Sequence, residues 1–329
     1  MTTINDIAKM ANVSRTTVSR VLNNKGYVSE DVRDRILKLV KETGYTPSLS
    51  AKSLRTKKSG VIGVILPKIS TETASRVVSG INEVVSKEDY QILLTDTELN
   101  KEKEIEFIRL LKSRQVDGII LLATNINEDL TQAIQTADLP FISIGQDLPG
   151  VTSILYDDYH AAADVTNMMI SHQHKKIAYI GVGEQDPSVG GLRKEGYLDT
   201  MAKNELPIHN EWIQEGDFSI ESGYECAKKI IKNSASNLPT AIFCVTDRMA
   251  IGAMEYLREQ GFSIPKDIAI AGIGASTLSK YVTPALTTVD YFNKHAGEKA
   301  AQLLLAQMKK KKPKEKFVQS YRLIKRDSV

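Results

Sequence analysis

The chain has 329 residues, of which 42% are apolar and 25% charged, so it is long enough for two or three domains with full hydrophobic cores and is not a disordered polypeptide. We expect neither a secretory signal nor a membrane span, because the first residues lack a signal-peptide pattern and no apolar run approaches the roughly 20 residues that cross a bilayer. Two cysteines, Cys226 and Cys244, exclude a disulfide framework and favour a cytoplasmic protein.

Charge is distributed unevenly along the chain. The 43 Lys and Arg residues and 40 Asp and Glu residues give a net charge of +3. Residues 1–60 alone hold twelve basic and five acidic side chains, a net +7, which leaves −4 for the rest. A small basic segment before a mildly acidic body predicts a domain that binds a polyanion at the N-terminus and a different activity in the remainder.

Three short helices are predicted in the first sixty residues. The first begins near residue 5 and breaks around residues 11–13. The second follows an N-cap at Ser14, and the third follows an N-cap at Ser29 and ends near Gly44. Three helices with a three-residue turn between the first two are typical of a helix-turn-helix domain.

The second helix indicates what this domain contacts. Its apolar spacing places Val18, Val21 and Leu22 on the inner face. The side chains left to point outward are Arg15, Thr16, Ser19 and Arg20. In a helix-turn-helix domain the start of this helix meets base edges in the major groove, where Arg suits guanine. A small helical bundle with ordinary solvated charges is the alternative that spacing leaves open.

The head of the chain resembles the lactose/galactose-repressor (LacI/GalR) family of bacterial transcription regulators. The similarity covers residues 4–54, INDIAKMANVSRTTVSRVLNNKGYVSEDVRDRILKLVKETGYTPSLSAKSL, with the elements D-I-A, T-V-S-R-V-L-N and G-Y-x-P followed by A-x-S-L. The resemblance implies major-groove contacts from Arg15, Thr16 and Arg20 and contacts to the DNA backbone from Thr17 and Ser19.

The resemblance also implies a hinge that folds on DNA. Residues 48–55 match the family's hinge helix, which orders when two subunits meet on the operator. Leu54 would enter the minor groove as an apolar wedge, with Ala51 and Arg55 alongside. Because a single three-helix head buries little DNA surface, we expect a homodimer on double-stranded operator DNA.

From residue 61 onward, apolar runs alternate with helical stretches. Strands are predicted over residues 61–66, 90–95, 118–122, 140–144, 177–181, 241–245 and 268–273. Helices are predicted over residues 72–87, 101–114, up to about 137, 160–171, 190–203, 220–232 and 248–260. This alternation predicts two doubly wound parallel sheets with a ligand cleft between them, at the carboxyl ends of the strands.

The body resembles the sugar-binding core that the same family shares with periplasmic sugar-binding proteins. Matching segments are D-G-I-I-L, H-x-K-I-A-Y-I-G, R-x-x-G-Y, T-D-x-x-A-x-G-A and P-x-L-T-T-V-D. The resemblance implies three crossings between subdomains, near residues 160, 291 and 320. The expected domains are the head over 1–46, the hinge over 47–58 and the core over 59–329, whose N-subdomain takes 61–160 and 292–320 and whose C-subdomain takes 161–291 and 321–329.

The family resemblance also implies an effector pocket. Its residues in this chain would be Lys68, Ser70, Thr73, Gln146, Arg193, Phe218, Thr246, Asp247 and Asp290, the last with Tyr291 as the alternative. Arg193 would bind adjacent sugar hydroxyls and Phe218 would pack on the sugar ring. For Asp247, the residue pattern leaves open a simple role as the N-cap of the helix that follows.

The identity of the effector depends on departures from the family. Gly274 stands where many members have an Asp that accepts sugar hydroxyls. The segments around residues 272–284 and 154–159 are most similar to trehalose-responsive members, with sucrose-responsive members next. Gln146 replaces an Arg that such members use for a phosphorylated disaccharide, so the effector can be a disaccharide or its phosphate.

The sequence as a whole predicts a transcriptional repressor of a carbohydrate-utilisation operon. No nucleotide-binding loop, nucleophile elbow or metal-ligand spacing is present, so we expect no enzymatic activity, no cofactor and no metal. Two alternatives share the fold: a solute-binding protein, and a global catabolite regulator that responds to a phosphorylated carrier protein. The basic head and the absence of a signal-peptide pattern argue against the first, and the trehalose-like segments against the second.

Overall fold

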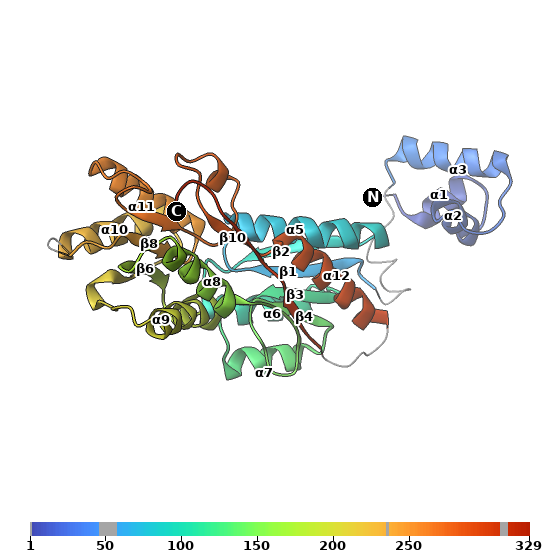
Figure 1. Cartoon of the computed structure of the whole chain (residues 1–329). Coiled ribbons are helices and arrows are strands. Elements are labelled where there is room, and N and C mark those ends of the chain that lie inside the picture. The colour runs from blue at the N-terminus through green and yellow to red at the C-terminus, as the bar shows by residue number, and fades with distance from the viewer. Residues whose placement is uncertain (1, 46–57, 235–236, 310–314) are drawn as a thin grey trace. The chain divides into compact units, whose positions relative to one another are not determined.

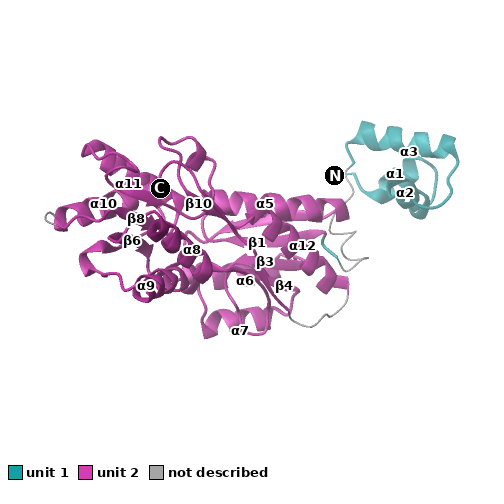
Figure 2. Ribbon diagram, in the orientation of Figure 1, with its two compact units in different colours: residues 1–59 teal, residues 60–329 magenta. Residues whose placement is uncertain are grey.

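A computed structural model describes residues 2–45, 58–234, 237–309 and 315–329. The chain divides into two compact units, residues 1–59 and residues 60–329 (Figure 2). The predicted hinge contacts Ala51, Leu54 and Arg55 lie outside the described residues. Within the part of the chain that the structure describes, no helix is both long and apolar enough to cross a membrane.

The smaller unit is a three-helix bundle. Its helices are α1 (Ile4–Met10), α2 (Arg15–Leu22) and α3 (Glu30–Thr43). Ser14 caps α2 by accepting a hydrogen bond from the backbone N–H of Thr17, and α3 ends at Gly44 with a φ of 62°. Ser29 precedes α3 as predicted, but its side chain caps no backbone N–H among the described residues. The core of the bundle consists of Ile7, Ala8, Ala11, Val18, Val21 and Ile36.

The larger unit contains two parallel sheets with helices on both faces of each (Figure 1), which confirms the predicted fold class. The first sheet has the order β11-β5-β4-β3-β1-β2. Its strands are β1 (Val61–Leu66), β2 (Gln91–Asp96), β3 (Gly118–Leu122), β4 (Phe141–Ile144), β5 (Thr152–Tyr156) and β11 (Lys316–Gln319). Its helices are α5 (Glu72–Val85) and α12 (Asn293–Lys309) on one face and α6 (Lys101–Ser113) and α7 (Glu128–Ala137) on the other.

Helices α5 and α12 pack with their backbones almost in contact. A Cβ atom on Gly80 would lie 1.9 Å from the carbonyl oxygen of Lys294, and one on Gly297 would lie 2.1 Å from the carbonyl oxygen of Val77. Because no side chain larger than a hydrogen fits at either position, the two glycines fix the start of α12 against α5.

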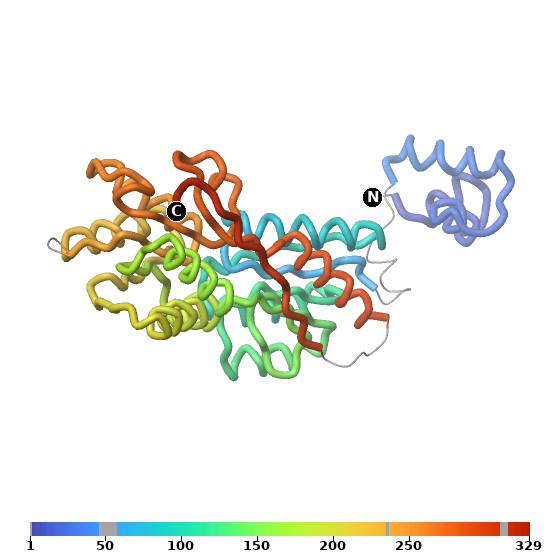
Figure 3. The backbone as a smooth tube through the Cα atoms, in the orientation of Figure 1, coloured from blue at the N-terminus to red at the C-terminus, as the bar shows by residue number. Residues whose placement is uncertain are grey.

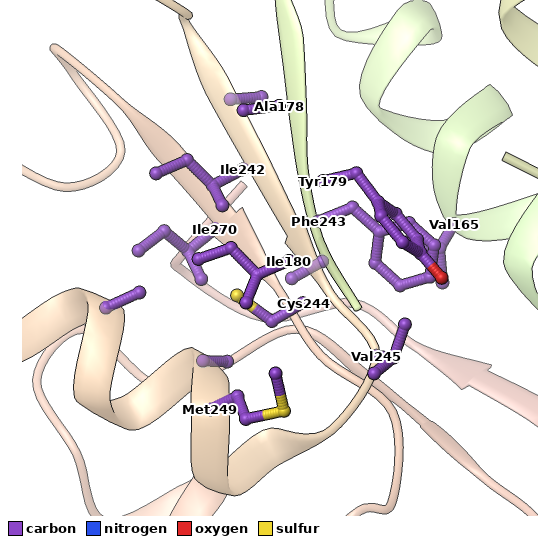
Figure 4. Packing of buried hydrophobic residues seen from close by; sticks show 14 of the residues in the cluster. Val165, Ala178, Tyr179, Ile180, Ile242, Phe243, Cys244, Val245, Met249 and Ile270 are labelled. Carbon is purple, nitrogen blue, oxygen red and sulfur yellow. The ribbon is translucent and has the colours of Figure 1, made fainter. Parts of the chain in front are cut away.

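The second sheet has the order β7-β6-β8-β9. Its strands are β6 (Ile177–Val182), β7 (Ile213–Gly216), β8 (Ala241–Cys244) and β9 (Ala269–Ala271), and its helices are α8 (Asp158–Ser171), α9 (Arg193–Lys203), α10 (Ile220–Asn233) and α11 (Asp247–Glu259). Side chains alternate between the faces: Tyr179 and Phe243 lie beside Val165 of α8, whereas Ile180 lies on the side of Met249 in α11 (Figure 4).

The chain passes between the two subdomains three times. The first passage, at Asp157, joins β5 to α8, and the second joins β10 (Thr288–Asp290) to α12. The third joins β11 to β12 (Arg322–Ile324), which pairs antiparallel with β10 (Figure 3). The first passage therefore comes three residues earlier than the expected residue 160.

Five strands are absent from the sequence prediction, namely β5, β7, β10, β11 and β12, and one helix begins at a different residue. Of these, β5, β7 and β11 belong to the parallel sheets, and β10 and β12 pair antiparallel with each other. The helix expected to start at residue 190 starts at Arg193, after a wide turn over Pro187–Leu192. These differences matter because β5 and the wide turn both border the cavity described next.

Candidate functional site

The first candidate site is the outer surface of α2 in the smaller unit. Arg15, Thr16 and Arg20 are exposed, as a role in the major groove requires. Thr17 and Ser19 are half-buried, and the Thr17 hydroxyl lies 2.9 Å from the Ser14 hydroxyl within the N-cap. The structure thus presents two Arg side chains and one Thr side chain on one accessible helix, a donor set suited to guanine and phosphate.

The second candidate site is a cavity between the two subdomains of the larger unit, with a volume of about 210 Å³. It lies at the carboxyl ends of strands from both sheets, where this architecture binds ligands. Seven predicted pocket residues line it: Lys68, Thr73, Gln146, Arg193, Phe218, Thr246 and Asp247. Residues that the prediction missed include Tyr156, Asp158, Asp186, Ser188 and Asn293.

Two predicted pocket residues do not line the cavity. Ser70 is exposed. The Asp290 carboxylate accepts a hydrogen bond from the backbone N–H of Phe292 at 2.9 Å and lies 3.6 Å from Arg322. Tyr291, its neighbour and the alternative in the prediction, lines the cavity instead.

Arg193 is buried against Asp158 at the wall of the cavity. Its Nε donates to Asp158 Oδ1 at 2.6 Å, and its Nη1 donates to the backbone carbonyl of Val245. The Tyr291 hydroxyl also donates to Asp158 Oδ1, at 2.9 Å, and the Arg193 guanidinium lies 5.4 Å from the Tyr291 ring centroid. Burial lowers the pKa of Arg193, but Asp158 more than reverses this and the net pKa is raised.

Gln146 joins the two subdomains at the cavity. Its Nε2 donates to Asp186 Oδ1 at 2.9 Å, and its Oε1 accepts from the Ser188 hydroxyl at 3.0 Å. Asp186 Oδ1 also accepts from the backbone N–H groups of Ser188 and Val189. Burial raises the pKa of Asp186, and these hydrogen bonds to its charged form oppose that shift.

A second set of contacts joins the subdomains through Glu72. Its carboxylate accepts from the Thr277 backbone N–H and from the Thr277 hydroxyl, each at 2.7 Å. Arg76, which pairs with Glu72, donates to the carbonyl oxygen of Ala275 at 2.9 Å. The cavity therefore lies between subdomains that are held together by hydrogen bonds at two separate places.

Asp247 is not an N-cap. Thr246 caps α11, its hydroxyl accepting from the backbone N–H of Met249 at 3.3 Å. The Asp247 carboxylate instead accepts from the backbone N–H of Ser276 at 2.6 Å and from the Thr288 hydroxyl. Burial raises the pKa of Asp247. Its carboxylate thus links α11 to the loop after β9, which contains Gly274.

Glu104 is a buried carboxyl group just behind the cavity wall. Its Oε2 accepts from Asn125 Nδ2 at 2.6 Å, and its Oε1 accepts from the hydroxyl of Thr124, which lines the cavity. Burial raises the pKa of Glu104 to about 7. Sequence reasoning missed this residue because its place in an amphipathic helix is typical of a solvated side chain.

The described residues contain no group of three or more His, Cys, Asp or Glu side chains arranged to hold a metal ion. Among the charged side chains of the cavity wall, three are cationic (Lys68, Arg193 and Arg248) and four are anionic (Glu72, Asp158, Asp186 and Asp247). Apolar and aromatic side chains, including Phe218, supply much of the remaining wall. A wall whose charges nearly cancel and which also presents apolar and aromatic side chains suits an uncharged ligand with one apolar face.

Comparison with known proteins places both sites in context. Residues 3–48 match the family described as bacterial regulatory proteins, lacI family, and residues 166–329 match a periplasmic binding protein-like domain. The chain is 32% identical to the HTH-type transcriptional regulator RegA of Clostridium saccharobutylicum, with 100% of this chain and 99% of that protein covered. It is 31% identical to catabolite control protein A of Priestia megaterium, with 96% of each covered.

A solved structure supports the fold independently. The lac repressor dimer bound to operator and the anti-inducer ONPF superimposes with a TM-score of 0.89, at 24% identity over 99% of this chain and 98% of that one. At this level of identity the likeness shows the shared architecture of a helical head and a two-subdomain core.

Proposed function

The chain belongs to the lacI family of bacterial regulatory proteins and is a DNA-binding transcriptional repressor of metabolic genes, and from that premise we propose that it controls a carbohydrate-utilisation operon in response to a neutral sugar. It acts as a cytoplasmic homodimer, with Arg15, Thr16 and Arg20 reading operator bases, Thr17 and Ser19 contacting phosphates, and the hinge around Leu54 reaching the minor groove.

The charges of the cavity support an uncharged effector. The Arg193 guanidinium, a group that could bind a phosphate, already donates to Asp158 and to the carbonyl of Val245. Anionic side chains outnumber cationic ones on the wall, and Gln146 adds no charge. Outside the Arg193–Asp158 pair, a dianionic phosphosugar would meet only Lys68 and Arg248 as wall cations, against four carboxylates. Within the neutral sugars, the trehalose-like segments make trehalose-type disaccharides the first candidates and sucrose-type the next.

The observation that carries the proposal is the cavity enclosed by contacts between the subdomains. A sugar that touches both subdomains binds the closed form more tightly than the open form, so it shifts the equilibrium between them. The angle between the subdomains would then set the distance between the hinges of the two subunits. Linkage requires that operator DNA and sugar alter each other's affinity by the same factor.

The experiment is a titration of operator binding. Selection from random duplexes with the full chain supplies an operator, and fluorescence anisotropy measures its affinity at fixed salt concentration, because salt alone changes protein–DNA affinity strongly. Trehalose, trehalose phosphate, sucrose and glucose are then added separately. We expect a neutral disaccharide to change the operator affinity at least tenfold. Unchanged affinity with every sugar would overturn the effector class, and no preference for any duplex would overturn sequence-specific binding.

A second candidate is a global catabolite regulator that responds to a phosphorylated carrier protein. The similarity to catabolite control protein A along 96% of the chain favours it. In the same titration, a phosphorylated carrier protein would increase operator affinity, whereas the sugars would have no effect. The two candidates are therefore distinguished by adding the phosphorylated carrier protein to the titration beside the sugars.

A further inference from the structure

Two residues that line the cavity each hold a buried polar atom without a hydrogen-bond partner. Six side chains among the described residues have such an atom, and only two of them, Tyr156 and Asn293, also line the cavity. The unpartnered atoms are the Tyr156 hydroxyl and Asn293 Oδ1. Because a buried polar atom without a partner destabilises the fold, its presence beside a cavity indicates that something in the cavity can pair with it.

Both residues lie where the chain passes between the subdomains. Tyr156 ends β5 just before the first passage, and Asn293 begins α12 just after the second. The Tyr156 ring packs 4.9 Å from the Tyr291 ring, between centroids, and Asn293 is only 3% exposed. The contact of α12 with α5 through Gly80 and Gly297 further fixes the position of Asn293. Both polar atoms are thus held on rigid elements.

The neighbouring polar groups of the wall are already used. The Gln146 amide binds Asp186 and Ser188, and the Arg193 guanidinium binds Asp158 and Val245. The Tyr156 hydroxyl and Asn293 Oδ1, in contrast, accept or donate no hydrogen bond within the described residues and are available to a ligand. A carbonyl oxygen such as Asn293 Oδ1 needs a donor, and a phenol can both donate and accept. Burial raises the pKa of Tyr156, so its phenol keeps its proton.

We propose that Tyr156 and Asn293 form a hydroxyl-recognising subsite of the effector cavity, which selects a neutral ligand that presents a hydroxyl to this wall over the corresponding deoxy compound. This inference rests on the proposed function, because it assumes that a carbohydrate occupies the cavity. A ligand hydroxyl can donate to Asn293 Oδ1, and a ligand hydroxyl can accept from the Tyr156 phenol.

The test compares the full chain with Tyr156→Phe and Asn293→Leu. Tyr179→Phe is the matched control, because the Tyr179 hydroxyl is likewise buried without a partner but does not line the cavity. Calorimetric titration with trehalose and with sucrose measures sugar affinity, and operator anisotropy without sugar measures DNA binding. For the sugar that wild type binds, we expect at least tenfold weaker affinity in Tyr156→Phe and Asn293→Leu, or about 1.4 kcal/mol, and no change in Tyr179→Phe.

Two further readouts separate recognition from structure. Removal of an unpartnered polar atom should not lower the thermal unfolding midpoint, and operator affinity without sugar should stay at the wild-type value. Deoxy analogues of the bound sugar should bind wild type more weakly than the sugar itself. For the analogue that lacks the hydroxyl facing Tyr156, Tyr156→Phe should bind no more weakly than wild type does.

The outcomes distinguish this inference from the proposed function. If Tyr156→Phe and Asn293→Leu bind the sugar as tightly as wild type, the subsite is overturned and the proposed function stands. If wild type binds none of the neutral candidate sugars, both the subsite and the proposed effector class are overturned. Should Asn293→Leu fail to fold, Asn293 has a structural role, and unchanged sugar affinity in Tyr156→Phe would then overturn the subsite.

Discussion

Gln146 and Asp186 are hydrogen-bonded across the two subdomains, with 2.9 Å between Gln146 Nε2 and Asp186 Oδ1. Gln146 follows β4 of the first sheet, and Asp186 caps the wide turn after β6 of the second. Gln146 therefore serves as a contact between subdomains, and its side chain is already hydrogen-bonded in the absence of a ligand.

Replacement of Gln146 by Leu should weaken sugar binding. The Gln146→Leu variant keeps the volume but loses the hydrogen bond to a buried carboxylate, so the closed form loses about 1.5 kcal/mol or more relative to the open form. We expect roughly tenfold weaker sugar affinity by calorimetry. Gln214→Leu, on the partly exposed strand β7 and outside the cavity wall, is the control and should bind normally. Equal affinities in both variants would show that the contact does not stabilise the closed form.

Replacement of Arg193 should lower the free energy of unfolding and abolish the effect of sugar on operator affinity. Arg193→Ala leaves Asp158 buried without its cation, which should lower the free energy of unfolding by about 3 kcal/mol or more in urea denaturation. Arg258→Ala breaks an exposed pair with Glu255 and should cost less than about 1 kcal/mol. Arg193→Lys, which retains a charge but not the separate donors that reach Asp158 and Val245, should fold and bind operator yet lose the sugar response. A normal response in Arg193→Lys would contradict the role of Arg193 in the cavity.

Operator recognition should depend on Arg20 in a sequence-specific manner. Arg20→Ala should weaken binding to the selected operator by about 1–3 kcal/mol. It should also reduce the ratio of the affinity for that operator to the affinity for random DNA. Lys38→Ala, on α3 and 3.9 Å from its ion-pair partner Glu42, should change both affinities little. Anisotropy titrations at one salt concentration measure the affinity of each variant, and of wild type, for the operator and for random DNA. A uniform loss on every duplex would instead assign Arg20 to the DNA backbone.

Stability should depend on pH through Glu104. Burial raises its pKa from an ordinary 4.5 to about 7, so the folded state binds more protons than the unfolded state between these pH values. The free energy of unfolding contributed by Glu104 is therefore complete below about pH 4.5 and is lost as pH rises through 7, at up to about 1.4 kcal/mol per pH unit. Urea denaturation between pH 5 and 8 should show a flatter profile for Glu104→Gln than for wild type. Parallel profiles would mean that Glu104 does not titrate in this range.

Much of the fold could be predicted from the sequence because its signals are local. The Ser14 cap and the spacing of Val18 and Val21 determine α2, and continuous apolar runs determine β1 and β3. Strand β7 lacks such a run because it lies at the edge of its sheet and is only partly buried. Strand β5 is short and follows a turn at Gly150, so its apolar run was too brief to stand out.

The cavity was predictable in outline but not in its contacts. Arg193 was named from its motif, yet its partner Asp158 lies 35 residues away in the sequence and is brought to it by the passage between subdomains. Tyr156 and Asn293 could not be named as polar groups without partners, because that property depends on everything packed around them. Asp247 was assigned an N-cap as its alternative role, and the preceding Thr246 holds that position instead.

The two places where hydrogen bonds join the subdomains, at Gln146 with Asp186 and at Glu72 with Thr277, also bear on how fast the protein responds. A molecule held behind both must wait for them to break before it can leave. Its residence time would then follow the rate of domain opening, so withdrawal of the sugar would reach the genes with a delay that the protein itself sets.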